Sequence, residues 1–279
     1  KKKRKPAWYH KQFLENPPLK SGDLLDIGCG QGEFLNAASN NLKFNLWGID
    51  IVRKNVKFIK ETYKLNNIYN QSLEEFSKRS DIPKFDVITV FEVMEHLIDP
   101  GGFLSNVKKL IKPGGYFIIS VPNKDRFGGI KEEWDYPPNH FFRWNEKSIR
   151  KLLELNGFET IQIKKEPFSK DFFVIRGIFS FGIMKRLKSR LGGYTSQKGG
   201  DVKFVEIQES LIYKILRGVT KIKNIILMPI IFITTIFLRL LGYKYWDLYI
   251  VAKLKTLKIE LCKPGTLQNF TKKKTFPLN

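Results

Sequence analysis

The sequence LLDIGCGQGEFL, Leu24–Leu35, decides how the chain folds. A short apolar run ends here in three alternating glycines, Gly28, Gly30 and Gly32, and a segment suited to a helix begins at Glu33. Glycine has no Cβ, so a backbone of this kind can turn sharply and approach a ligand closely. The helix that follows directs free N–H groups and the positive end of its dipole toward a carboxylate or a phosphate. We therefore expect a strand, a ligand-binding glycine loop and a helix.

A second feature of the predicted ligand site is an acidic residue at the end of the next apolar run. The run Phe44–Ile49 ends at Asp50, 20 residues after Gly30. A carboxylate at that place can accept hydrogen bonds from two ribose hydroxyls, which predicts a nucleoside ligand. The glycine spacing is G-x-G-x-G rather than G-x-G-x-x-G, which disfavours a dinucleotide-dependent dehydrogenase. The alternative, a tight turn without a ligand, does not account for Asp50 at this distance.

Apolar runs and helical patterns alternate along the first 165 residues. The expected strands are 24–27, 44–49, 68–71, 85–91, 116–121 and 160–164, and the expected helices are 33–40, 52–65, 103–111 and 145–156. The run Phe85–Phe91 is nearly all apolar, as a strand covered on both faces would be. This alternation predicts an α/β fold with a doubly wound, mostly parallel sheet, whose ligand binds at the carboxyl ends of the strands.

Several motifs together resemble the class I S-adenosylmethionine-dependent methyltransferases. They are the glycine loop, Gly48–Asp50, QSLEEF (Gln71–Phe76), FDVITVFEVMEHLIDP (Phe85–Pro100) and LIKPGGYFIISVPN (Leu110–Asn123). The string E-V-x-E-H is similar to the group of ubiquinone-biosynthesis O-methyltransferases, and the segment Pro137–Glu159 resembles methyltransferases encoded with polysaccharide enzymes. The resemblance covers about residues 20–165 and a final strand in Trp246–Lys255. It implies a seven-stranded Rossmann-like methyltransferase fold with a helical insert before the last strand.

The resemblance also implies S-adenosyl-L-methionine as the cofactor and names the residues that bind it. The implied cofactor-binding residues are Asp26, Gly28, Cys29, Gly30, Asp50, Ile51, Ser72, Leu73, Phe91 and Glu92. Among them, Asp50 is the expected ribose ligand, and Ser72 and Leu73 are expected beside the adenine.

Methylation of a hydroxyl needs a group that removes its proton, a task suited to His or Glu. Candidate catalytic residues are Glu95 and His96, after the fourth strand, and His140, after the fifth. His96 could instead cap or order its loop, and His140 could simply pack there. Glu92, Glu95 and His96 could together hold a divalent metal, but a salt bridge at a helix end is the preferred interpretation, so no metal is predicted.

The composition predicts an anionic partner. The 279 residues include 49 Lys or Arg and 27 Asp or Glu, a net charge of +22, which indicates a membrane surface or nucleic acid. A nucleic-acid base is disfavoured as the target, because no Asn/Asp-Pro-Pro-aromatic motif follows the fourth strand. Two cysteines and the absence of an initial secretory signal predict a reduced, cytoplasmic location.

The segment 167–245 differs from the rest of the chain. It holds 14 basic and 4 acidic residues, a net charge of +10, yet it is rich in Phe, Ile and Leu. Its most apolar run, Ile225–Leu241, is 17 residues long and contains Pro229 and Arg239, at the short limit for a membrane span. We therefore expect basic amphipathic helices on the inner face of a membrane. A lid or a dimer contact is the alternative, and a true span is the third.

These observations divide the chain into five parts and lead to a predicted function. The parts are a basic N-terminal arm and lid (1–19), a methyltransferase core (20–166), the insert (167–245), the final strand (246–262) and a basic tail (263–279). We expect a membrane-associated methyltransferase that O-methylates a saccharide hydroxyl of a lipid-linked glycan, or a quinol. The alternatives are a soluble enzyme for a small molecule or nucleotide sugar, an RNA methyltransferase and a non-catalytic scaffold. The residues leave open whether it forms a homo-oligomer.

Overall fold

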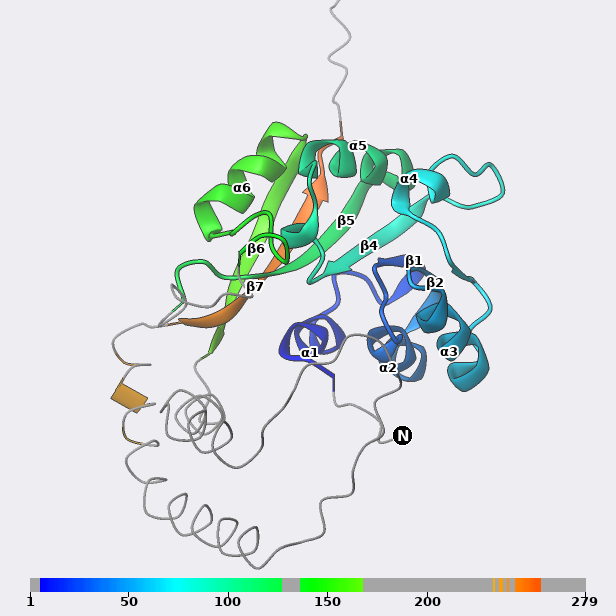
Figure 1. Ribbon diagram of the computed structural model, residues 1–279, viewed down its shortest axis with the longest axis horizontal. Coiled ribbons are helices and arrows are strands. Elements are labelled where there is room, and N and C mark those ends of the chain that lie inside the picture. Colours follow the sequence, from blue (N-terminus) through cyan, green and yellow to red (C-terminus); the bar gives the residue numbers. More distant parts are fainter. Residues whose placement is uncertain are drawn as a thin grey trace, which may run out of the picture.

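The computed structural model describes residues 6–126, 136–167 and 244–256, and four single residues, 233, 236, 237 and 240. These parts form one seven-stranded sheet in the order β3-β2-β1-β4-β5-β7-β6 (Figure 1). The strands are β1 (Ser21–Ile27), β2 (Lys43–Ile49), β3 (Ile68–Tyr69), β4 (Phe85–Phe91), β5 (Ile111–Pro122), β6 (Phe158–Pro167) and β7 (Lys244–Leu254). The helices are α1 (Trp8–Glu15), α2 (Glu33–Asn41), α3 (Arg53–Tyr63), α4 (Leu73–Phe76), α5 (Pro100–Leu110) and α6 (Glu146–Leu155), with a 3₁₀ turn η1 (Met94–His96).

The sheet is mostly parallel, and its order places the glycine loop at the centre. Strands β1 to β5 pair with one another in parallel, whereas β7 runs antiparallel to both β5 and β6. The chain leaves β1 toward β2 and β3 on one side and returns to β4 on the other. The switch of direction therefore lies between β1 and β4, and ligands bind at such a point in doubly wound sheets. The predicted fold class is confirmed.

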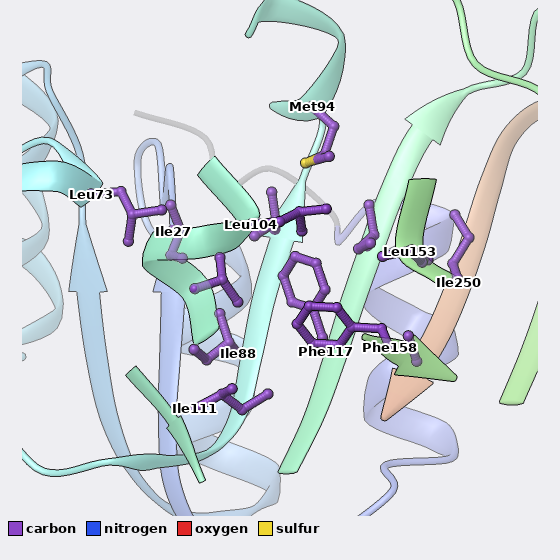
Figure 2. Packing of buried hydrophobic residues seen from close by; sticks show 14 of the residues in the cluster. Ile27, Leu73, Ile88, Met94, Leu104, Ile111, Phe117, Leu153, Phe158 and Ile250 are labelled. Carbon is purple, nitrogen blue, oxygen red and sulfur yellow. The ribbon is translucent and has the colours of Figure 1, made fainter. Parts of the chain in front are cut away.

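Two apolar clusters cover the two faces of the sheet. Helices α4, α5 and α6 supply one face and helices α1, α2 and α3 the other, as Figure 1 shows. In the first cluster, the rings of Phe117 and Phe158 lie with centroids 5.3 Å apart, and Leu104 and Leu153 reach the sheet from α5 and α6 (Figure 2). Burial of such side chains contributes roughly 1.5–3 kcal/mol each. Helix α6 begins at Asn145, whose side chain accepts a hydrogen bond from the Ser148 N–H, as N-cap residues do.

Several predicted boundaries were wrong by a few residues. The helix expected at 103–111 ends one residue earlier, because α5 spans Pro100–Leu110 with Asp99 capping its start, and Ile111 opens β5. The turn residues Pro113–Gly115 lie inside β5, where the pairing with β4 shifts its register between Phe85 and Val87. At the edges of the predicted insert 167–245, Pro167 ends β6 and Lys244 begins β7. Residues 168–243, apart from the four single positions, and residues 257–279, which include the predicted tail 263–279, lie outside the described residues.

Candidate active site

The glycine loop after β1 is held against the end of β2. The N–H groups of Gly28 and Cys29 both donate to the carbonyl of Ile49, at 2.9 and 3.0 Å. Gly28 has φ +72°, and a Cβ there would lie 2.6 Å from Val93 Cγ2, so both the conformation and the space require glycine. Gly30 has φ +54°, and a Cβ there would meet nothing within 4 Å. The loop therefore presents bare backbone beside open space.

Asp50 at the end of β2 is buried and is hydrogen-bonded to the glycine loop. Its Oδ2 accepts a hydrogen bond from the Gly30 N–H at 2.8 Å. Its Oδ1 accepts from the Val52 N–H at 2.8 Å and from Asn55 Nδ2 at 3.2 Å. A carboxylate offers about four acceptor positions, so three bonds from the chain leave about one for a ligand hydroxyl. Two ribose hydroxyls can both be accepted only when one of these bonds is released.

A cavity of about 700 Å³ opens beside Asp50. This volume lies within the range of roughly 300–1,000 Å³ that small-molecule sites occupy. Six of the ten predicted cofactor residues line it: Gly28, Asp50, Ile51, Ser72, Leu73 and Glu92. Ser72 caps helix α4, accepting from the Glu75 N–H, so that loop has a defined conformation at the cavity wall. Bare backbone, a carboxylate and a mostly apolar wall fit a nucleoside with a charged amino-acid tail, as S-adenosyl-L-methionine is.

The other four predicted cofactor residues lie around this cavity rather than along its wall. They are Asp26, Cys29, Gly30 and Phe91. Asp26 is buried below the loop, where its Oδ1 accepts a hydrogen bond from Thr89 Oγ1 at 2.7 Å. Burial raises the pKa of Asp26 to about 7, and the charge of Asp50 adds to this, while the Thr89 bond opposes it. Burial likewise raises the pKa of the Cys29 thiol. We interpret Asp26 and Cys29 as support for the loop, whereas Gly30 belongs to the loop itself and Phe91 packs against Phe34.

Helix α1 closes the side of the site near Phe91. The ring of Tyr9 stacks on Phe91 with centroids 5.3 Å apart, and the His10 ring meets Phe91 edge-on at 5.0 Å. Phe34, from the first turn of α2, contacts both His10 and Phe91. Burial lowers the pKa of His10 to about 4, so its imidazole is neutral at physiological pH. Within the predicted N-terminal arm and lid, helix α1 packs against Phe34 and Phe91, and residues 1–5 lie outside the described residues.

A second cavity of about 250 Å³ adjoins the first. Its lining residues are Glu92, Glu95, His96, Pro122, Arg126, His140 and Asp247. All three predicted catalytic residues, Glu95, His96 and His140, are therefore brought together here. Glu92 and His96 line both cavities, which places these two side chains at the junction.

The loop after β5 is tied to the turn η1, and this brings the two histidines together. The N–H groups of Phe141 and Phe142 donate to the carbonyl of Glu95 at 2.9 and 3.1 Å. His96 Nδ1 lies 2.6 Å from the carbonyl of Asn139, so in this pairing Nδ1 carries the proton. The His96 and His140 rings meet edge-on with centroids 4.8 Å apart. His96 Nε2 lies 3.8 Å from Glu95 Oε1.

The same residues have the spacing of a cation site. One ligand atom each from Glu95, His96 and His140 lie within 4.8 Å of one another. The metal ligands considered from the sequence were Glu92, Glu95 and His96. In the structure, His140 rather than Glu92 lies with Glu95 and His96 at this spacing. Imidazole nitrogen and carboxylate oxygen suit several divalent metals. We assign no ion to this trio, because the His96–Glu95 approach also fits the predicted ion pair at a helix end.

Sequence analysis missed two charged residues of the second cavity, Arg126 and Asp247. Strand β7 is antiparallel, so its beginning lies at the carboxyl ends of the parallel strands, and its register pairs Asp247 with Pro122 of β5. Burial raises the pKa of Asp247 to about 7, and Arg126 opposes this rise. Burial and the charge of Asp247 raise the pKa of Glu166, on β6, to about 8. Asp247 lies in the final strand expected from the sequence. Only the antiparallel direction of that strand, seen in the structure, shows that Asp247 reaches the site.

Comparisons with known proteins agree with this fold and site. The family described as Methyltransferase domain matches residues 3–163, and the chain belongs to that family. The class that the fold and site define is the class I S-adenosylmethionine-dependent methyltransferases.

Among named relatives, a probable S-adenosylmethionine-dependent methyltransferase of Mycolicibacterium smegmatis is 29% identical over 49% of this chain and 52% of its own length. A ubiquinone biosynthesis O-methyltransferase of Coxiella burnetii is 29% identical over 56% of this chain and 75% of its own. The chain thus spans about half the length of the first of these relatives. A solved methyltransferase from Archaeoglobus fulgidus superposes with TM-score 0.50 and 20% identity, over 88% of this chain and 92% of its own.

Within the parts of the chain that the structure describes, no helix is long and apolar enough to cross a membrane. The run Ile225–Leu241 lies outside those parts except for Ile233, Ile236, Phe237 and Leu240. Each of the four is helical and exposed.

Proposed function

We propose that the protein transfers the methyl group of S-adenosyl-L-methionine to a hydroxyl of a saccharide, and that it works at a membrane surface on a lipid-linked glycan. The observation that carries this proposal is the pair of adjoining cavities. The larger has a nucleoside-binding carboxylate and bare loop backbone, and the smaller has two histidines and several carboxyl groups. The sulfonium of the cofactor supplies an already activated methyl group, so the protein's main task is to position the acceptor.

The cofactor-binding residues have distinct proposed roles. Asp50 accepts a ribose hydroxyl, and the backbone at Gly30 makes room for the ligand beside it. Ser72 and Leu73 line the cavity wall near α4, where the adenine ring would lie. Asp26 supports the loop from below through its bond to Thr89.

The lining of the second cavity supports a saccharide acceptor. Six of its seven lining residues carry a charged or polar side chain, and Pro122 is the apolar one. Sugar hydroxyls are both donors and acceptors, so they can pair with carboxylates as well as with Arg126. A buried site that pairs hydroxyls strongly rejects ligands that lack them. A cavity of about 250 Å³ suits one sugar unit at a time.

The side chains that could remove the hydroxyl proton are His96, His140 and Glu95. His96 has its Nδ1 engaged by the Asn139 carbonyl, which leaves Nε2 as the acceptor nitrogen. Glu95 beside it stabilises the imidazolium that forms when Nε2 takes a proton. His140, buried and in ring contact with His96, is the alternative base.

A quinol is the second candidate acceptor, and a specific observation favours it. The relative from Coxiella burnetii is named as a ubiquinone biosynthesis enzyme. Next in the chain to cavity-lining residues, Ile98 is 79% exposed and Phe141 is 46% exposed, and exposed apolar side chains of this kind would suit a prenyl chain. A soluble enzyme for a nucleotide sugar remains the third candidate.

Membrane docking is proposed for the insert 167–245. Ile233, Ile236, Phe237 and Leu240 have the spacing i, i+3, i+4 and i+7 of one helical face, and all four are exposed. The segment carries a net charge of +10, and basic amphipathic segments bind anionic membranes. Replacing these four residues by Ser should abolish flotation with anionic liposomes, and unchanged flotation would contradict the docking proposal.

Methyl-labelled S-adenosylmethionine tests the acceptor. The protein is incubated with it and a total extract of its own cell, and the products are separated into lipid, small aqueous molecules, and nucleic acid with protein. Label in a lipid fraction that mild acid hydrolysis releases as a methylated sugar supports a lipid-linked glycan. Label that stays with an apolar ring after hydrolysis indicates a quinol, and label confined to small aqueous products indicates the soluble enzyme.

A further inference from the structure

Glu92 occupies a special position between the two cavities. Among the described residues, only Glu92 and His96 line both. A methyl group that leaves the cofactor in one cavity for an acceptor in the other must cross where the two meet. The proposed methyl transfer therefore requires the sulfur that carries the methyl group to lie at this junction, with the Glu92 carboxyl beside it.

The local structure holds Glu92 in place. Ser120 on β5 is fully buried and donates a hydrogen bond from Oγ to Glu92 Oε1 at 2.7 Å. The Glu92 N–H donates to the Ser120 carbonyl at 3.1 Å. Glu92 also has φ +55°, the left-handed region, which a residue with a side chain seldom adopts. Such a conformation is energetically unfavourable and is typical of functional sites.

We propose that Glu92 selects the positively charged cofactor over its neutral demethylated product. The two molecules share the adenine, the ribose and the amino-acid tail, and they differ in the methyl group and the charge on sulfur. A carboxylate at the junction attracts the sulfonium and gains nothing from the neutral thioether. Methyl transfer therefore removes the attraction at the moment when the product has to leave. The proposal rests on the proposed methyl transfer between the two cavities.

The surroundings of Glu92 make this selection depend on pH. Burial raises the pKa of Glu92 well above its ordinary value, the charges of Asp247 and Glu95 raise it further, and the Ser120 bond opposes the rise. The titratable and charged groups that face this region are Asp247 on β7, Glu166 on β6, Glu95 and His96 on η1, Tyr9 on α1, Asp26 on β1, and Arg126 and His140, which follow β5. Glu92 is ionised above its raised pKa, so preference for the charged cofactor increases as the pH rises.

Calorimetry with two defined ligands tests the proposal without any acceptor. The Kd values of S-adenosylmethionine and S-adenosylhomocysteine are measured for wild type, Glu92→Gln and Glu95→Gln from pH 6 to 9. Glu92→Gln keeps the size and the Ser120 contact but loses the charge. We expect the ratio Kd(homocysteine form)/Kd(methionine form) to fall at least about tenfold in Glu92→Gln at the alkaline end of this range, where the Glu92 carboxyl is most ionised. In Glu95→Gln, whose side chain lines only the second cavity, it should change less.

An unchanged ratio in Glu92→Gln, or an equal fall in both variants, would overturn the proposal. Near wild-type affinity for S-adenosylhomocysteine shows that the variant is folded. If Glu92→Gln does not fold, Ser120→Ala decides instead, because loss of the Ser120 hydrogen bond disfavours the ionised Glu92 carboxylate and should lower the same ratio. A constant ratio in Ser120→Ala would then count against the proposal. Failure to find a labelled acceptor affects only the proposed function, since these ratios require no turnover.

Discussion

Replacement of Asp50 by Ala should weaken both cofactor binding and the glycine loop. The substitution removes three hydrogen bonds, two of them from the N–H groups of Gly30 and Val52. Net contributions of hydrogen bonds to a charged group are about 1.5–3 kcal/mol, and a neutral bond contributes about 1 kcal/mol. Water can reach the loop once the side chain is gone, so we expect the free energy of unfolding to fall by about 2–4 kcal/mol. For a chain of this size, that lowers Tm by roughly 4–16 °C.

Asp50→Ala should weaken cofactor binding by more than the loss of one hydrogen bond to the carboxylate would. Loss of one charge-assisted hydrogen bond to ribose corresponds to about a tenfold to hundredfold weaker Kd, and a disordered loop at Gly30 adds to this. Calorimetric titration with S-adenosylmethionine and urea unfolding of the same preparation measure the two effects. Asn55→Ala is the matched control: it removes the longest of the three bonds, at 3.2 Å, and frees an acceptor position. We expect unchanged or tighter cofactor binding in Asn55→Ala. Wild-type affinity in Asp50→Ala would refute the ribose assignment.

Three further predictions concern turnover, pH and the loop backbone. His140→Ala should lower kcat for the labelled acceptor while the Kd of S-adenosylmethionine stays within about twofold; equal turnover would remove His140 from the candidate bases. Asp26 has its pKa raised from 3.8 to about 7 in the folded protein, so the folded state binds more protons and stability falls as the pH rises from about 4 to 7. Urea unfolding should then show Asp26→Asn more stable than wild type at pH 8, by on the order of 2–4 kcal/mol, and no gain at pH 4; a gain independent of pH would contradict this. Gly28→Ala should lower Tm more than Gly30→Ala, because only the former places its Cβ against Val93. Adding Val93→Ala to Gly28→Ala should restore part of the lost Tm. Equal effects of the two glycine substitutions would contradict that contact.

The centre of the site could be predicted from the sequence because local patterns determine it. A strand that ends in alternating glycines is typical of a ligand-binding loop, and Asp50 follows at the end of the adjacent strand. In parallel strands, equivalent ends meet at one edge of the sheet. The positions of Gly28 and Asp50 at the first cavity follow from those two facts, whereas Ile51, Ser72 and Leu73 were expected from the family resemblance.

The second cavity depends on contacts between distant segments, which a sequence pattern does not show. Asp247 reaches the site because β7 is antiparallel, and no periodicity distinguishes that direction from a parallel strand. The contact between His96 and His140 requires the loop after β5 to fold back on η1. The three hydrogen bonds to Asp50 are likewise a property of the folded loop. The sequence indicates a ribose ligand there, whereas the structure shows that most of the carboxylate already serves the chain.

The bounds of helix α5 differ from those that its sequence pattern predicts. Apolar residues from Phe103 predict a helix, and Pro113–Gly115 predict its end. The structure begins this helix earlier, since Asp99 accepts a hydrogen bond from the Gly102 N–H and Pro100 occupies the first turn. The strand then begins at Ile111, because the pairing of Phe85 with Ile111 extends the sheet past the turn residues.

A crystal structure of the protein with S-adenosylhomocysteine would show where the cofactor lies. We predict a ribose hydroxyl on the Asp50 carboxylate and the thioether sulfur at the junction of the two cavities, between Glu92 and His96. The second cavity, with His140 and Asp247, should then lie directly beyond the sulfur. A ligand whose sulfur points away from Glu92, or whose ribose makes no contact with Asp50, would contradict the assignment of the two cavities to cofactor and acceptor.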